Sequence, residues 1–267
     1  MTICKDGLAI TSLFDWEIRA GPKSSNHWVD GRSAKEAARA WLDERGDTLP
    51  KELSRVLAGH GDFDNVKTWT AEAEVKLKFD DFAGECRNSD LVVDAIDSKG
   101  SFLIAVEAKA DEPFSETVAE ALAAAVERYL KNERSNGLTR IKQLAKALLG
   151  PRQAHEPSVK DLRYQLLTAC AGALCEAERR GYTRVLMLIH EFFTDKTSDD
   201  LHLRNAYDLN NFVARLSHGT VTAVRPDSIC GPFFVPGAPI MSAKVALYVG
   251  KACRDLRSID AQSLPSE

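Results

Sequence analysis

The chain has 267 residues, of which 44% are apolar and 28% are charged, and its formal net charge is −4. This balance is typical of a soluble globular protein and argues against a disordered chain. A sequence pI near 5.9 argues against a protein that binds polyanions over its whole surface. No apolar run approaches the roughly 18 to 20 residues that span a bilayer, so we expect no membrane insertion. The length suits a single domain, 1–267, with a substantial core.

Six cysteines are spread along the chain without a CxxC pair, and no secretory segment precedes them. This pattern predicts reduced thiols and a cytoplasmic protein. The six histidines show neither HxxxH nor HxH spacing, so a zinc enzyme has no support.

Apolar periodicity predicts the elements in chain order, with spacings of three and four for helices and alternation for strands. After mixed strand and loop character in residues 1–27, we expect helices at 34–44 and 52–60, a strand at 66–79, a β-hairpin at 88–111, helices at 116–133, 138–149 and 158–180, a strand at 183–193, a helix at 203–216, and strands at 220–224 and 244–250. This order predicts an α/β fold with a mixed central sheet, in which antiparallel strands come first and a crossover helix follows.

The helix predicted at 158–180 begins with Ser158 as its capping residue and ends before Gly181. It leads into the strand at 183–193, a continuous apolar run that is typical of a strand buried on both faces.

The hairpin at 88–111 carries the residues with the clearest chemical signal. Its turn is Asp97–Gly100, and a symmetric turn makes paired positions sum to 197. Asp90 then lies opposite Glu107, and Lys109 lies on the same face, because strand side chains alternate with a period of two. Two facing carboxylates repel each other unless a divalent cation, a shared proton or a base compensates them. The hairpin therefore predicts a hydrolytic metal site.

The alternative is a hairpin with one solvated face, on which Lys109 neutralises Glu107. Val92, Leu103 and Ala105 share that face, so we expect the charges to be partly buried. Burying charge is costly unless it serves a purpose, and this favours a functional site.

Ser89-Asp90 in one strand, Glu107-Ala108-Lys109 in the next, and the helix and strand that follow resemble the PD-(D/E)XK nuclease superfamily, which includes restriction endonucleases and many repair nucleases. The segments VEAKADEPF and DLRYQLLTACAGALCEAERRG further resemble a bacterial family assigned to that fold. The resemblance covers residues 33–193 and implies a restriction-endonuclease-like core with helices flanking a mixed central sheet, and with N-terminal and C-terminal elaborations outside it. Ser89 replaces the proline of the family pattern, at a position without chemistry.

The resemblance implies divalent-metal-dependent hydrolysis of phosphodiester bonds in DNA or RNA. Asp90 and Glu107 would ligate Mg²⁺ or Mn²⁺ together with the main-chain carbonyl of Ala108. Lys109 would orient or deprotonate the attacking water, or stabilise the transition state by its charge. Gln165 would lie near the metal waters, although a solvated glutamine is an equal alternative. A homodimer would suit double-strand cleavage.

A second hypothesis is a catalytically inactive nuclease-like module that binds nucleic acid or a partner protein. The acidic pI and the absence of a base-reading motif support it. A nucleophilic hydrolase is set aside, since the chain has no GxSxG motif.

Three further acidic residues have a structural and a functional interpretation. Asp94 lies about 13 Å along the strand from Asp90, so we expect it not to be a ligand. Glu36 is either an extra ligand or part of a capping box with Ser33, and we favour the capping box. Glu112 either helps to position the metal or compensates the dipole of the next helix, and we favour the second role.

Basic residues and a histidine have similar alternatives. We expect Arg163 to lie at the surface or in an ion pair rather than on a phosphate. We expect His190 to be a hydrogen-bonded core residue. The most basic stretch is more typical of a solvated helical face than of a phosphate-binding surface, and it consists of Lys131, Arg134, Arg140, Lys142 and Lys146.

Overall fold

A computed structural model describes residues 2–22, 24–43, 48–82, 87–131, 133, 135–242 and 244–258. Two residues of the sequence analysis lie outside this range: Cys86, one of the six cysteines, and Arg134 of the basic stretch. The described cysteines are free thiols, as predicted. None of the described helices combines the length and the apolar content needed to cross a bilayer.

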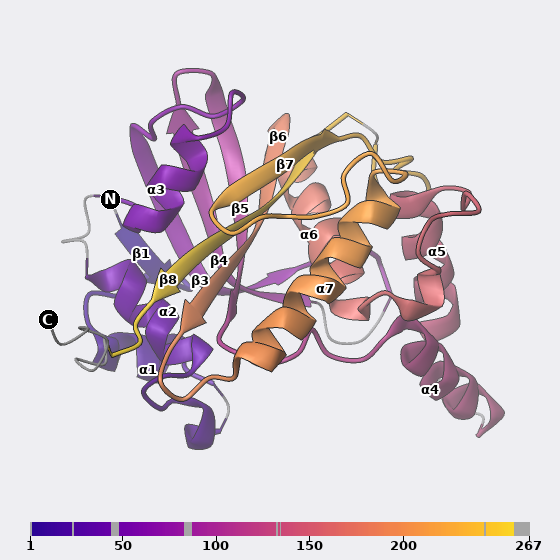
Figure 1. Cartoon of the computed structure of the whole chain (residues 1–267), viewed down its shortest axis with the longest axis horizontal. Helices are drawn as coiled ribbons and strands as arrows, with labels where there is room; N and C mark the ends of the chain where they lie inside the picture. Colours follow the sequence, from indigo (N-terminus) through magenta and orange to yellow (C-terminus); the bar gives the residue numbers. More distant parts are fainter. Residues whose placement is uncertain are drawn as a thin grey trace, which may run out of the picture.

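Within the described residues, eight strands form one mixed sheet in the order β2-β1-β3-β4-β5-β6-β8-β7 (Figure 1). Strands β3, β4 and β5 pair antiparallel, whereas β5, β6 and β8 pair parallel. The strands are β1 (Thr2–Lys5), β2 (Leu8–Ala9), β3 (Thr68–Leu77), β4 (Arg87–Asp97), β5 (Gly100–Lys109), β6 (Arg184–Phe193), β7 (Ser228–Phe233) and β8 (Ala246–Asp255).

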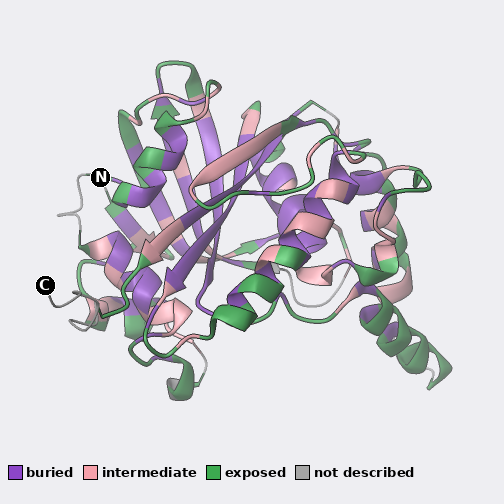
Figure 2. Cartoon of the chain, viewed as in Figure 1, coloured by how far each residue is buried: buried purple, intermediate pink, exposed green. Residues whose placement is uncertain are grey.

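Helices cover both faces of this sheet, which confirms the predicted α/β class. They are α1 (Leu13–Ala20), α2 (Ser33–Leu42), α3 (Lys51–Ala58), α4 (Val118–Leu130), α5 (Gly137–Leu149), α6 (Tyr164–Arg179) and α7 (Asp199–Leu216), with short 3-10 helices η1 (Ser25–His27) and η2 (Val159–Asp161). Figure 2 shows the strands mostly buried between the helices, whereas much of α4 is exposed.

Each face of the sheet has its own hydrophobic core. The α2-side core contains Trp41 and Leu53 from α2 and α3, and the α6-side core contains Leu166 and Phe212 from α6 and α7. Strand β6 supplies side chains to both cores, because it is buried on both faces and paired on both edges. This confirms the prediction from its unbroken apolar run.

The helix predicted at 158–180 begins later, at Tyr164. The reason is that the two residues directly before it, Leu162 and Arg163, are extended: the Leu162 carbonyl accepts a hydrogen bond from the Val118 amide, and the Tyr164 amide donates to the Glu116 carbonyl. An extended pairing with the segment before α4 is incompatible with helical backbone at the same residues.

Two other predictions need correction. The strand expected at 220–224 is irregular, and the nearby edge strand is β7 instead. Side chains accept hydrogen bonds from the amides of the irregular segment: the Val224 amide donates to Asn210 Oδ1, and the Val221 amide donates to Ser217 Oγ. The N-terminal region also contains α1, whose capping residue is Ser12.

Strands β1, β2, β7 and β8 lie outside residues 33–193 and extend the same sheet on both edges. The elaborations around the predicted core are therefore continuous with its sheet rather than separate from it.

Candidate functional site

The hairpin of β4 and β5 has the predicted register over most of its length. Cα partners run from Asp97 with Gly100 to Leu91 with Val106, and each pair sums to 197. The ladder ends there, one position short of Asp90 and Glu107. We call this point, with Asp90, Glu107 and Ala108, the ladder end.

The pairing between β3 and β4 is also interrupted at Asp90. Ala73 is the Cα partner of Leu91 and Val75 is that of Ser89, so the strand ladder skips the position where Glu74 and Asp90 lie opposite each other. Glu74 has a φ of 51°. Left-handed backbone is strained for a residue other than glycine, and such strain is often found at functional sites.

The interruption changes which face the side chains occupy. Along β3, Ala71 and Ala73 contribute to the α2-side core, whereas Val75 and Leu77 contact the α6-side core. Regular alternation would keep all four on one face. The sequence predicted that regular alternation along the strands would place Asp90 and Glu107 on one face. That reason is wrong, because the alternation breaks at Asp90.

Side chains replace the ladder hydrogen bonds beyond this point. An Asp90 carboxylate oxygen, Oδ2, accepts a hydrogen bond from the Ala108 amide at 2.6 Å. The buried Ser89 hydroxyl bonds to the main-chain oxygens of Val106 and Leu91 at 3.0 and 2.9 Å. Asp90 is thus fixed against the main chain of the strand that carries Glu107.

Glu107, Lys109 and Gln165 form one hydrogen-bonded group. Lys109 Nζ lies 3.1 Å from Glu107 Oε1, and Gln165 Nε2 donates to the same oxygen at 2.5 Å. Lys109 Nζ also donates to Gln165 Oε1 at 3.4 Å. Glu107 and Lys109 are only 6% and 7% exposed. The structure thus brings together the residues predicted from the hairpin and the one predicted from the following helix.

Two further contacts hold Lys109. Its ammonium group lies 5.2 Å from the centre of the Phe114 ring and donates to the Pro113 carbonyl at 3.4 Å. A buried ion pair is tolerated when additional partners satisfy its remaining donors and acceptors. Lys109 and Glu107 meet that condition.

A cavity of about 280 Å³ opens onto the ladder end. One wall consists of residues from α1 and α2, among them the buried Trp16 and Ala37. The other wall includes the three predicted charged residues, Asp90, Glu107 and Lys109.

Glu74, Glu112 and His27 also line the cavity, and only Glu112 was a candidate from the sequence. The carboxylate of Glu112 accepts hydrogen bonds from the Ala110 amide at 2.8 Å and from the Ser33 hydroxyl at 3.1 Å. Glu112 was expected to compensate the dipole of the next helix, α4. Thr117 and Glu120 form a capping box at the start of that helix instead. Glu112 could be recognised as a candidate because it is a carboxylate only three residues after the end of β5. Glu74 carried no comparable signal, because a strand pattern does not show where its pairing breaks.

The remaining acidic candidates are occupied elsewhere. Asp94 forms an ion pair with Arg180, accepts a hydrogen bond from the Tyr182 hydroxyl and does not line the cavity. Glu36 bonds to the Gly31 amide and to Arg39, both at 2.7 Å, and not to the Ser33 amide. The predicted capping box between Ser33 and Glu36 is therefore wrong. Ser33 is already the first residue of α2, and Glu36 accepts its hydrogen bond from the Gly31 amide before the helix.

Arg163 and His190 have structural partners, as expected. Arg163 forms an ion pair with Asp208 at 2.8 Å. His190 is fully buried and contacts Glu52 at 2.6 Å. In the basic stretch Arg140 is paired with Asp80, with contacts at 2.5 and 3.0 Å, and the other described members, Lys131, Lys142 and Lys146, are exposed.

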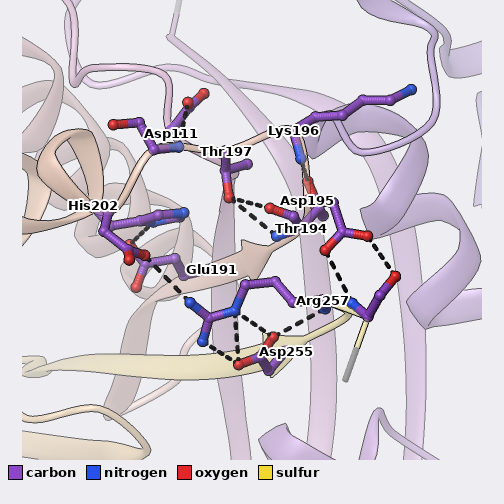
Figure 3. A network of polar contacts seen from close by, with 12 residues as sticks. Asp111, Glu191, Thr194, Asp195, Lys196, Thr197, His202, Asp255 and Arg257 are labelled. Carbon is purple, nitrogen blue, oxygen red and sulfur yellow. Dashed lines mark hydrogen bonds and ion pairs between the residues drawn. The ribbon is translucent and has the colours of Figure 1, made fainter. Parts of the chain in front are cut away.

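A second polar network secures the loop after β6 (Figure 3), and one of its residues, Glu191, is the Cα partner of Lys109 in the sheet. His202 of α7 bonds through Nδ1 to the buried Glu191 at 2.8 Å. Asp111, two residues after Lys109, accepts a hydrogen bond from the Ser198 amide. It also forms an ion pair with Arg32 at 2.6 Å. These contacts connect α2, the end of β5 and the start of α7 around the site.

A family model described as a domain of unknown function, DUF6946, matches residues 9–256. The chain belongs to the DUF6946 family. The matched residues include every residue that lines the cavity at the ladder end, from Trp16 to Glu112, and also Gln165. Comparisons with curated proteins and with solved structures gave no match.

Proposed function

We propose that this DUF6946 protein hydrolyses phosphodiester bonds in nucleic acid with the help of a divalent metal, on a restriction-endonuclease-like core. The observation that carries the proposal is the ladder end. Asp90, Glu107 and Lys109 line one cavity there, and Gln165 forms hydrogen bonds with both Glu107 and Lys109. Groups with acid, base and metal-binding chemistry in one enclosed cavity are the usual mark of an active site.

The donor set fits Mg²⁺ or Mn²⁺. Asp90, Glu107 and the main-chain carbonyl of Ala108 are oxygen donors, which hard divalent cations prefer. Among the described residues, no group of three or more His, Cys, Asp or Glu side chains is arranged to hold an ion. Mg²⁺ sites often use one or two carboxylates and complete their shell with waters and substrate phosphate. A bound ion would supply Lewis-acid activation of the phosphoryl group and of a water.

The protein side chains have separate tasks in this proposal. Lys109 carries a positive charge next to Glu107, where it would hold the attacking water and stabilise negative charge on the phosphoryl oxygens. Gln165 fixes the orientation of the Glu107 carboxylate by its hydrogen bond at 2.5 Å. Burial strengthens both effects, because few water molecules compete with these contacts.

The test compares wild type with Glu107→Gln and Lys109→Ala in Mn²⁺-dependent cleavage of labelled DNA and RNA. We expect each change to reduce cleavage by about a hundredfold or more, the usual effect of losing a group that stabilises the transition state. Asp94→Asn is the matched control, since this acidic residue of the neighbouring hairpin strand, β4, is paired with Arg180 and lies outside the cavity. Unchanged cleavage by either site variant would contradict the proposal.

One observation favours the alternative of an inactive binding module. Lys109 already lies 3.1 Å from Glu107, so the buried carboxylate is compensated without an ion. Calorimetric titration with Mn²⁺ separates the two functions. Metal binding that is lost in Asp90→Asn supports the enzyme, whereas nucleic-acid binding without any Mn²⁺ binding at millimolar concentration supports the module.

A further inference from the structure

The ladder end lines a small, partly open cavity. The cavity volume of about 280 Å³ lies just below the range of about 300–1,000 Å³ that is typical of small-molecule pockets. Glu107 and Lys109 are almost completely buried beneath it. A reacting phosphate must therefore enter the cavity, because these side chains do not reach the surface.

The two walls of the cavity differ in chemistry. Trp16, Ala20, Ala34 and Ala37 from α1 and α2 form an apolar wall. The opposite wall carries the carboxylates and Lys109. A nucleotide has the same two sides, a base and sugar that favour apolar contact and a phosphate that requires a cation.

Among the described residues, the charges that line the cavity and the neighbouring α2 do not form a track for a long polyanion. The described lining residues carry four carboxylates, on Glu74, Asp90, Glu107 and Glu112, and one lysine. The cations of the neighbouring α2 region are paired: Arg32 with Asp111 at 2.6 Å, and Lys35 and Arg39 with Asp30 at 2.7 and 2.6 Å. Proteins that bind duplex DNA along its backbone normally present several unpaired cations to the phosphates.

We infer that the cavity admits one nucleotide residue of a single strand, and that the substrate of the proposed phosphodiesterase is single-stranded nucleic acid rather than duplex. The inference rests on the proposed function, because it assigns the substrate of the same site. A cavity of this volume has room for one nucleotide residue but not for an intact base pair with its two backbones. Enzymes with enclosed sites act on single strands or on nucleotides turned out of the helix.

The first test compares two DNA substrates of equal length in Mn²⁺. One is a linear single strand without secondary structure, and the other is a duplex closed at both ends by hairpin loops of two nucleotides. We expect the linear strand to be cleaved at least about tenfold faster. Equal or faster cleavage within the closed duplex would overturn the inference while leaving the proposed phosphodiesterase activity intact.

The second test fills the cavity without changing a charged residue. Ala34→Leu extends an apolar side chain from the wall of α2, and we expect it to weaken binding of the single strand by about tenfold or more. Ala119→Leu is the matched control, because Ala119 is also the second residue of its helix, α4, but is exposed and far from the lining residues. Fluorescence polarisation of the labelled strand in Ca²⁺ measures the binding.

The binding measurement also separates the two proposals. If neither DNA is cleaved in Mn²⁺, the phosphodiesterase fails, and the polarisation data still decide whether the cavity takes a single strand. Equal affinity of Ala34→Leu and wild type, tighter binding of the closed duplex, or binding of neither DNA would each overturn the inference.

Discussion

Gln165 is the residue on which the geometry of the site depends most directly. It lies in the first turn of α6, and its amide contacts both Glu107 and Lys109. The amide group can donate to a carboxylate and accept from an ammonium group at the same time. Gln165 therefore sets the relative position of two oppositely charged side chains that come from another element.

Replacing this amide with an apolar group of similar size tests its role. We expect Gln165→Leu to reduce Mn²⁺-dependent cleavage by about 10 to 100-fold, the usual effect of removing a group that orients a metal ligand. The metal affinity should fall with the activity, because the Glu107 carboxylate loses its fixed orientation. Gln143→Leu on α5 is the control, since Gln143 lines a different cavity. If Gln165→Leu and the control had equal activity and Mn²⁺ affinity, the assigned role would be wrong.

The residues of the site were predictable where short-range spacing determines them. Glu107 and Lys109 follow from alternation in one strand, and the register sum places Asp90 next to them. The break in alternation at Asp90 and the contribution of Trp16 were not predictable. The first requires an unusual backbone angle at Glu74, and the second depends on a helix more than 70 residues away from Asp90 in the chain.

At the scale of elements, the close approach of α6 to the sheet positions the first turn of that helix. Gly172 lies in the middle of α6, and an added Cβ would come within 2.8 Å of the Leu77 Cβ on β3. A side chain at this position must therefore move the helix or the strand, since real Cβ contacts are longer.

We expect Gly172→Ala to destabilise the protein by about 1–3 kcal/mol, the usual cost of overpacking a core. The midpoint of urea unfolding should fall, although alanine favours helix more than glycine does. Gly61→Ala is the control, because nothing lies within 4 Å of its added Cβ. A Gly172→Ala variant as stable as wild type would show that α6 can shift without cost.

The elements themselves followed from periodicity where the chain has long amphipathic or apolar runs, as in α7 and β6. The prediction failed where a distant segment competes for the backbone. The residues before Tyr164 contain good capping signals, yet they pair with the chain before α4 instead. A single sequence does not show which of two local structures a distant partner will favour.

At the scale of the whole molecule, three distant parts of the chain meet at Glu52. Its carboxylate contacts His190 of β6 at 2.6 Å and Arg254 of β8 at 2.8 and 3.1 Å. Burial by itself would raise the pKa of Glu52, but the hydrogen bonds from His190 and Arg254 lower it from 4.5 to about 2. Burial lowers the pKa of His190.

These shifts predict how the free energy of unfolding depends on pH. A carboxyl group with a lowered pKa stabilises the fold above its unfolded value, so the contribution of Glu52 should be lost between about pH 4.5 and pH 2. A histidine with a lowered pKa takes up its proton at a lower pH in the fold than in the unfolded chain, so stability should already begin to fall below about pH 6.5. The Glu52 contribution amounts to at most about 3 kcal/mol. Denaturant titrations of wild type and Glu52→Gln between pH 7 and pH 3 measure it, and an equal loss in both proteins would contradict it.

The overall α/β class was predictable because helices and strands alternate over most of the chain. The full width of the sheet was not, since β1, β2 and β7 are short edge strands, and edge strands are recognised by their neighbours rather than by their own pattern.

The hydrogen bond from the Ala108 amide to Asp90 gives the site an internal spectroscopic probe. This amide proton bonds to a titratable side chain, so its chemical shift and its exchange with solvent should follow the charge on Asp90. A divalent ion drawn to that carboxylate should alter the same signal before any substrate is present. An isotope-labelled sample would then report occupancy of the site from one backbone resonance, without an assay of turnover.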